Sequence, residues 1–66
     1  MGENALRTGV CLVRIERQGS GVLITLRTND DIRQLSTERV DTVADVGAAV
    51  QMVREFLTTF ARRSQG

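Results

Sequence analysis

The sequence predicts an α+β fold: a small antiparallel sheet, made of a β-hairpin and a third strand, followed by one long amphipathic C-terminal helix packed on one face. Two observations lead to this prediction. Apolar and polar residues alternate on both sides of Gly19-Ser20, as in half-buried strands. From residue 42 onward, apolar residues recur instead at three- and four-residue steps, as on one side of a helix.

The first two strands are predicted to form a hairpin around Gly19-Ser20. This pair suits a two-residue type II′ turn, which favours glycine at its first central position. The turn places Gln18 opposite Gly21 and brings one apolar set onto a single face, namely Cys11, Val13, Ile15, Val22, Ile24 and Leu26. The opposite face carries Leu12, Arg14, Glu16, Leu23, Thr25 and Arg27.

A turn and a third strand are predicted after the hairpin. Residues 29–32, NDDI, favour a turn because Asn and Asp side chains bond to nearby backbone groups more readily than they continue a strand. A third extended segment is predicted from about Arg33 to Asp41, with Leu35 and Val40 as its apolar anchors.

The helix is predicted to begin at Thr42, which forms an approximate capping box with Asp45. Arg62 and Arg63 suit the negative C-terminal end of the helix dipole. One apolar stripe comprises Val43, Val46, Val50, Val53, Leu57 and Phe60, widened by Ala49 and Phe56. We expect this stripe and the apolar face of the hairpin to form one core.

The length of 66 residues predicts one domain, over residues 10–63, between a frayed segment 1–9 and a tail 64–66. Such a small domain has little core and is usually stabilised by disulfides, metals or oligomerisation. The single cysteine cannot form an internal disulfide, and without histidine the usual zinc ligand sets are missing. Self-association therefore becomes the expected source of additional stability.

The composition argues against catalysis, because the chain has no histidine, lysine or tyrosine to act as a positioned proton carrier. We predict no enzyme, no catalytic residue, no cofactor and no metal. Asp30 and Asp31 are interpreted as turn residues, and Cys11 as a small buried apolar residue. The glycines of residues 18–21, QGSG, join two strands and so do not form a phosphate loop, which needs a strand leading into a helix.

The favoured hypothesis is a homodimer that acts by protein–protein contact and buries its outer sheet face or an exposed strand edge. Its candidate interface residues are Leu12, Arg14, Glu16, Leu23, Thr25 and Arg27. The alternative is a small DNA-binding or regulatory protein that uses the Arg14 and Arg27 face, joined by Arg33 or Arg39. A third hypothesis is a ligand-binding dimer with a pocket between its subunits.

The expected setting is the bacterial cytoplasm. No apolar run approaches the roughly 20 residues needed to span a membrane, and the first residues lack the apolar stretch of a signal peptide. All nine basic residues are arginines, which is typical of a GC-rich bacterial genome. A net charge of +1 argues against strong nonspecific binding to nucleic acid.

Overall fold

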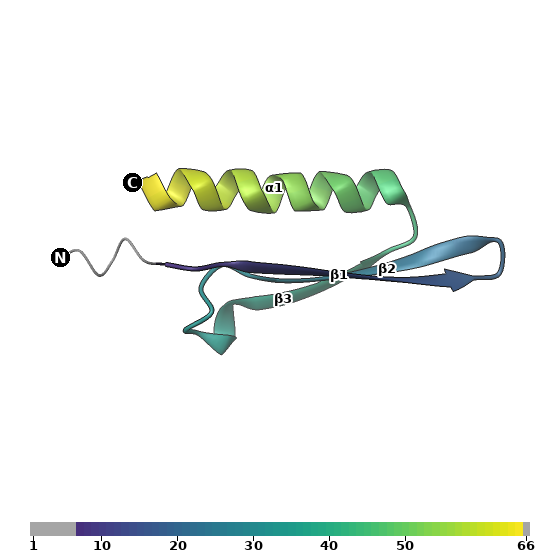
Figure 1. Cartoon of the computed structure of the whole chain (residues 1–66), viewed down its shortest axis with the longest axis horizontal. Helices are drawn as coiled ribbons and strands as arrows, with labels where there is room; N and C mark the ends of the chain where they lie inside the picture. The colour runs from purple at the N-terminus through teal and green to yellow at the C-terminus, as the bar shows by residue number, and fades with distance from the viewer. Residues whose placement is uncertain (1–6, 66) are drawn as a thin grey trace.

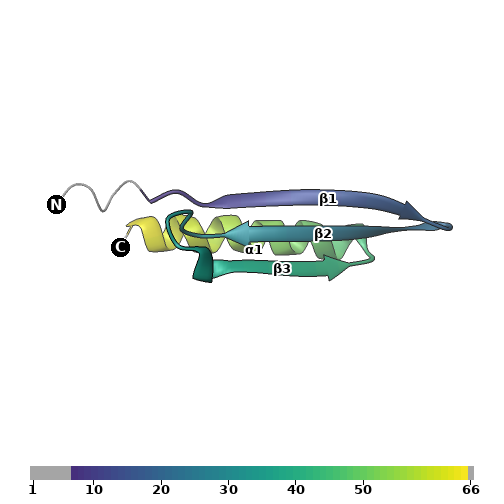
Figure 2. The same ribbon diagram turned by 90° about the horizontal axis from the view of Figure 1, so that it is seen from below.

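The computed structural model describes residues 7–65, and residues 1–6 and 66 lie outside the described part. The elements are β1 (Val10–Gln18), β2 (Gly21–Asn29), the short 3-10 turn η2 (Leu35–Thr37), β3 (Glu38–Val43) and α1 (Val46–Gln65). The three strands form one antiparallel sheet in the order β1-β2-β3, and α1 runs along one face of it (Figures 1 and 2). The predicted α+β fold is confirmed.

The hairpin of β1 and β2 follows the predicted register without a bulge. Gln18 pairs with Gly21 across the turn, and Ile15 pairs with Ile24. Gly19 has a φ of 58°, whereas no non-glycine residue between 7 and 65 has a positive φ. Type I′ turns need positive φ at both central positions, so this combination fits the predicted type II′ turn.

β3 begins at Glu38, later than the predicted start at Arg33. The reason is a loop held by side chains: the Asp31 N–H donates to Asn29 Oδ1 at 2.9 Å, and the Arg33 N–H donates to Asp31 Oδ1 at 3.1 Å. These bonds fold the backbone back on itself and delay strand pairing.

Val40, one of the two predicted apolar anchors of the third strand, does not serve the core. Val40 lies opposite Arg27, on the face that α1 does not cover, and is largely exposed. The prediction for Val40 was therefore wrong. The side chain of Leu35 lies outside the described part of the structure.

α1 begins at Val46, so the predicted start at Thr42 was wrong. Thr42 pairs with Thr25 and Val43 with Ile24, and both complete β3 because β-branched residues pack well in a sheet. Asp45 caps the helix instead, since the Ala48 N–H donates to Asp45 Oδ2 at 2.8 Å.

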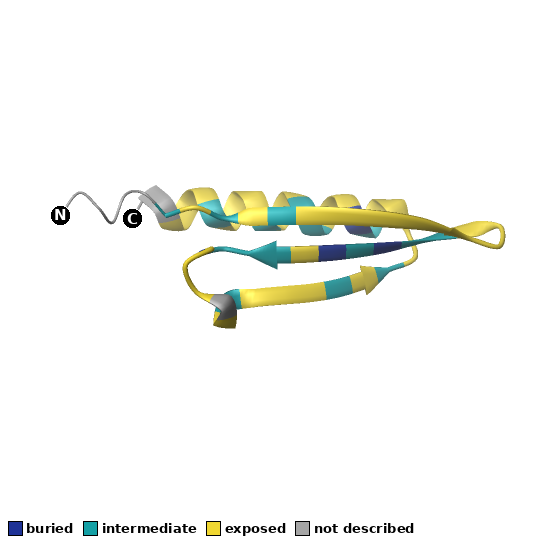
Figure 3. Cartoon of the chain, turned by 60° about the horizontal axis from the view of Figure 1, so that its bottom comes forward, coloured by how far each residue is buried: buried dark blue, intermediate teal, exposed yellow. Residues whose placement is uncertain are grey.

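The core is small and lies under α1. The buried apolar residues among those described are Ile24, Leu26 and Ala49. Partly buried residues pack around them, namely Cys11, Val22, Val43, Met52 and Val53. The buried residues of the sheet lie on β2, while most of β1 is exposed (Figure 3).

The prediction of one continuous core was wrong for Val13 and Ile15 of β1 and for one flank of the helix, whereas Cys11 of β1 packs against the core. α1 packs on β2 and β3, so it leaves the inner face of β1 open. The residues expected in the core but found exposed are Val13, Ile15, Val46, Val50 and Leu57.

The ends of the described chain lie close together. Arg7 Nε donates to the Asp30 carbonyl at 3.0 Å, and the Arg7 guanidinium lies 5.4 Å from the centroid of the Phe60 ring. Gly9 lies so close to Phe60 that an added Cβ would come within 2.9 Å of the ring. Residues 7–9 of the predicted frayed segment therefore contact the domain, and α1 continues to Gln65, beyond the predicted boundary at 63.

Candidate interaction surfaces

Two grooves of different character lie along the two sides of α1. The groove on the β1 side, called the apolar groove below, has a volume of about 620 Å³. Its strand residues are Val13, Ile15, Ile24 and Leu26, and its helix residues are Val46, Ala49, Val50, Val53, Arg54, Leu57 and Thr58. Arg54 and Thr58 are the polar residues among these, so the groove presents aliphatic surface almost throughout.

Five large aliphatic side chains of the apolar groove are exposed to solvent. Their exposed fractions lie between 56% and 59%, and they are Val13, Ile15, Val46, Val50 and Leu57. By comparison, the described core buries three apolar residues. Contiguous exposed apolar patches on soluble proteins are often sites of interaction.

The groove borders an open sheet edge. Within residues 7–65, β1 pairs with β2 alone, so one side of its backbone has no strand partner. Proline residues and β-bulges commonly protect edge strands from pairing. The chain contains no proline, and β1 contains no bulge. β1 is therefore able to accept another strand.

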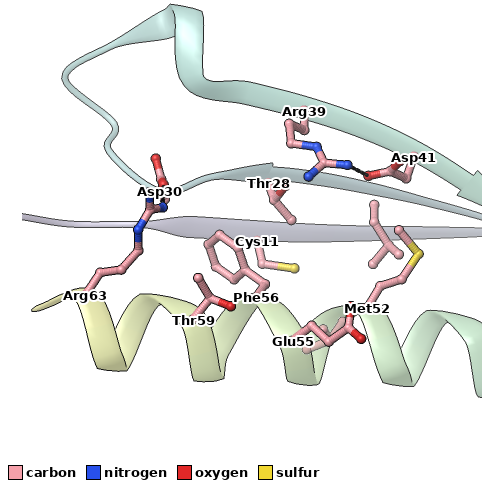
Figure 4. Close-up of a pocket in the computed structure, with 12 residues that line it drawn as sticks. Cys11, Thr28, Asp30, Arg39, Asp41, Met52, Glu55, Phe56, Thr59 and Arg63 are labelled. Carbon is pink, nitrogen blue, oxygen red and sulfur yellow. Dashed lines mark hydrogen bonds and ion pairs between the residues drawn. The ribbon is translucent and has the colours of Figure 1, made fainter.

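The second groove, called the polar groove below, lies between α1 and the strands β2 and β3 and has a volume of about 280 Å³ (Figure 4). Arg63 Nη1 lies 2.8 Å from Asp30 Oδ2, and Arg39 Nη2 lies 3.9 Å from Asp41 Oδ2. The Arg63–Asp30 pair joins α1 to the loop after β2, whereas the Arg39–Asp41 pair lies within β3. The other residues that line the groove are Cys11, Leu26, Thr28, Met52, Val53, Glu55, Phe56 and Thr59.

The six candidate interface residues predicted from the sequence share the face of the sheet that α1 leaves uncovered. The register pairs Leu12 with Arg27, Arg14 with Thr25, and Glu16 with Leu23, and directly opposed residues point to the same side. Arg14 and Glu16 form an ion pair at 2.7 Å. The structure brings these residues together, and their role in an interface stays a prediction.

Arg14 and Arg27 share this face, but the further arginines that a DNA-binding face would use, Arg33 and Arg39, do not join them. Arg39 lies opposite Thr28 on the helix side of the sheet and lines the polar groove, so the prediction that it joins Arg14 and Arg27 was wrong. Alternation along β3 puts Arg39 and Val40 on opposite faces. Arg27 Nε itself lies 3.3 Å from Glu38 Oε2.

Arg33 stays with the loop before β3. Its Nε donates to Asp31 Oδ1 at 3.1 Å. The hydrogen bonds from the Arg33 side chain and backbone lower the pKa of Asp31, and the same carboxylate raises the pKa of Arg33. The prediction that Asp31 serves a turn is confirmed, because this carboxylate bonds to the loop around it.

Cys11 packs against the core and also lines the polar groove, and it is partly exposed, not fully buried as predicted. Among the described residues, no group of three or more His, Cys, Asp or Glu side chains is arranged to hold a metal ion. No helix within residues 7–65 is long and apolar enough to cross a membrane.

Sequence reasoning missed the apolar groove, although two signals pointed to it. A helix with its side chains is about 10 Å wide and strands lie about 4.8 Å apart, so one helix covers about two strands of a sheet. The third strand must then stay open on that side. The apolar arc of α1, which includes Val46, Met52 and Leu57, is also wider than a surface helix needs to cover a sheet.

Comparisons with known proteins identify no relative: no family model matches the chain, no curated protein matches its sequence, and no solved structure matches its fold.

Proposed function

We propose that this protein is a small non-enzymatic module that acts by protein–protein contact and associates with itself. The observation that supports this proposal is the apolar groove, where five aliphatic side chains are each more than half exposed beside the open edge of β1. Covering them would enlarge a core that has three buried apolar residues in the described chain.

Other features of the chain favour contact with protein over chemistry or binding to nucleic acid. The sequence has no histidine, lysine or tyrosine, which removes most of the side chains that act as acids and bases near neutral pH. On the uncovered face, Arg14 and Arg27 each have a carboxylate within 3.3 Å, so few positive charges remain free to contact phosphates.

We further propose that this module works in the bacterial cytoplasm. The basic residues are all arginines, and the single cysteine fits a reducing compartment, where disulfides rarely form.

Sedimentation equilibrium of the wild-type chain tests self-association. We expect a mass of twice the 7.3 kDa of one chain at micromolar concentrations, with dissociation on dilution. A mass of 7.3 kDa that persists at high micromolar concentration would contradict self-association.

A further inference from the structure

We propose, on the basis of the self-association above, that two copies join edge to edge through β1. The three strands of each copy then form one continuous sheet, in the order β3-β2-β1 followed by β1-β2-β3 of the second copy. A two-fold axis perpendicular to the sheet relates the copies, so that both helices lie on the same face. The occupant of the apolar groove is therefore the same groove of a second copy.

The two edges of the sheet differ in how ready they are to pair. β1 has nine residues and carries exposed apolar side chains on both faces, Leu12 on one side and Val13 and Ile15 on the other. β3 has six residues, of which Glu38, Arg39 and Asp41 are charged, whereas the three charged residues of β1 are spread over nine positions, namely Arg14, Glu16 and Arg17. Short, charged strands resist pairing with another chain, whereas long apolar ones invite it. β1 is therefore the edge that joins.

The hairpin determines which backbone groups of β1 are free. In a two-residue hairpin, the residues that flank the turn exchange hydrogen bonds, and bonded and non-bonded pairs alternate from there. Gln18 and Gly21 flank this turn, so the N–H groups of Arg14 and Glu16 point toward β2. The N–H and C=O groups of Val13 and Ile15 point to the open edge.

The same residues carry the apolar side chains of the groove. Alternation along β1 places Val13 and Ile15 on the helix side of the sheet. Pairing β1 with its copy about an axis at Ile15 places the Ile15 side chains of both chains side by side and Val13 opposite Arg17 of the partner subunit, and it joins the two grooves into one. The joined groove has strand residues as its floor and the Val46, Val50 and Leu57 flanks of the two helices as its walls.

The area that a stable interface buries requires contact along the β1 edge in addition to the apolar groove. A fully exposed aliphatic side chain presents about 60–120 Å² of apolar surface, so five that are just over half exposed present roughly 150–350 Å². A standard stable interface buries about 800 Å² on each partner. The groove alone falls short, and pairing along residues 12–18 of β1, which an axis at Ile15 brings into register, adds contact area on both faces of the strand.

Charge complementarity favours a copy of this chain as the partner. Arg14 and Glu16 are two residues apart on the uncovered face of β1. A two-fold axis at Ile15 places Arg14 opposite Glu16 of the partner subunit, and the reverse pair forms by symmetry. With a net charge of +1 on each chain, repulsion between two copies is small. A foreign helix in the groove would leave the free N–H groups of β1 without a partner.

Amide hydrogen exchange on the wild-type protein, at concentrations above and below dimer dissociation, tests this arrangement. We expect the Val13, Ile15 and Arg17 amides to exchange at least roughly tenfold more slowly in the dimer, since they gain partners only there. The Arg14 and Glu16 amides serve as internal controls, because they are bonded to β2 in either state.

The outcomes separate this inference from the proposed function. A dimer with slow exchange at Val13 and Ile15 supports joining through β1. A dimer in which these amides exchange as fast as in the monomer overturns the edge arrangement and leaves self-association standing, through the uncovered face or through the groove alone. A monomer at every concentration overturns both.

Val13→Pro gives an independent test. Proline removes the outward N–H of Val13 and leaves the bonds of Arg14 to β2 in place, and proline is tolerated in edge strands at such positions. We expect dimer affinity to fall at least roughly tenfold, because the bond is lost once in each copy. Val13→Ile keeps the N–H and should retain the dimer. Equal affinity of both variants, with the Arg14 and Glu16 amides still protected, would contradict the proposal.

Discussion

The two grooves beside α1 are bounded by the same helix and the same central strand, yet they differ in how complete they are. In the polar groove, Arg63 meets Asp30 and Arg39 meets Asp41, so charges on the surface have partners within the chain. In the apolar groove, Val13, Ile15 and Val50 face water. The ion pairs of the polar groove are stable in contact with water. The exposed aliphatic side chains of the apolar groove would be stabilised by a partner that covers them.

The difference follows from where the helix lies. α1 packs over β2 and β3, so the helix covers the sheet on that side, and Arg63 of α1 reaches Asp30 in the loop after β2. β1 lies outside the width that one helix covers. One chain therefore covers the β2 and β3 side of its own sheet, whereas a second copy would cover the β1 side.

The largest expected effect concerns Leu26, which lines both grooves and is 1% exposed. Leu26→Ala should destabilise the fold by about 2–5 kcal/mol, because it leaves a cavity in the core between the two grooves. Urea denaturation followed by circular dichroism measures the loss. Leu12→Ala, at a position 58% exposed on the uncovered face, is the control and should cost far less. Equal losses would contradict this placement of the core.

A new charge should distinguish the two grooves. Val50→Glu places a carboxylate in the apolar groove, and we expect it to weaken self-association by at least roughly a hundredfold, since each copy then loses the hydration of a carboxylate that Arg54, one helical turn away, offsets only in part. Thr59→Glu places the same charge in the polar groove, within one helical turn of Arg63, and should leave association unchanged. Sedimentation velocity measures the dimer affinity of both variants. Similar weakening by both would contradict the view that the two grooves differ in their role in self-association.

Gly19 fixes the register that puts Val13 and Ile15 in the apolar groove. Gly19→Val should destabilise the domain by about 1–2 kcal/mol, because a β-branched residue at a φ of 58° is strained. Ser20→Asn, at the neighbouring turn position, should have little effect. Thermal unfolding of both variants checks this, and equal melting temperatures would show that the turn does not control the register.

The smallest expected effect lies in the loop next to the polar groove and depends on pH. Hydrogen bonds from Arg33 lower the pKa of Asp31 in the folded state, so the unfolded state binds more protons in acid. This contribution to stability is present above the unfolded pKa of about 3.9 and is lost as the pH falls through the lower folded pKa.

Asp31→Asn removes the titrating group. The variant should be less stable than the wild type at pH 7, and the difference should shrink below about pH 4. Urea unfolding at several pH values measures this difference. A difference that stays constant down to pH 2 would show that Asp31 acts through shape and not through its charge.

Local signals in the sequence predicted the elements that depend on neighbouring residues. Gly19-Ser20 predicted the turn and the pairing of Ile15 with Ile24, because a two-residue hairpin has one register. The helix start was misplaced because Thr42 resembles a cap, and the pairing of Thr42 with Thr25 overrides that local preference.

The candidate site depended on tertiary geometry and was only partly predictable. The period of two along β1 indicated correctly that Val13 and Ile15 share the face of Ile24. It could not show that α1 would lie over β2 and β3, because periodicity gives the apolar side of an element and not its lateral position. That position decides whether Ile15 is buried within one chain or left for a partner.

The most direct test of the account is an isotope-filtered nuclear Overhauser experiment on a mixture of labelled and unlabelled chains, which detects contacts between copies only. We predict contacts between the methyl groups of Val13 and Ile15 in one copy and those of the partner subunit. The claim that this protein self-associates through the apolar groove would be contradicted by either of two results. One is contacts confined to Leu12, Leu23 and Val40 on the uncovered face, and the other is no contacts between copies at high micromolar concentration.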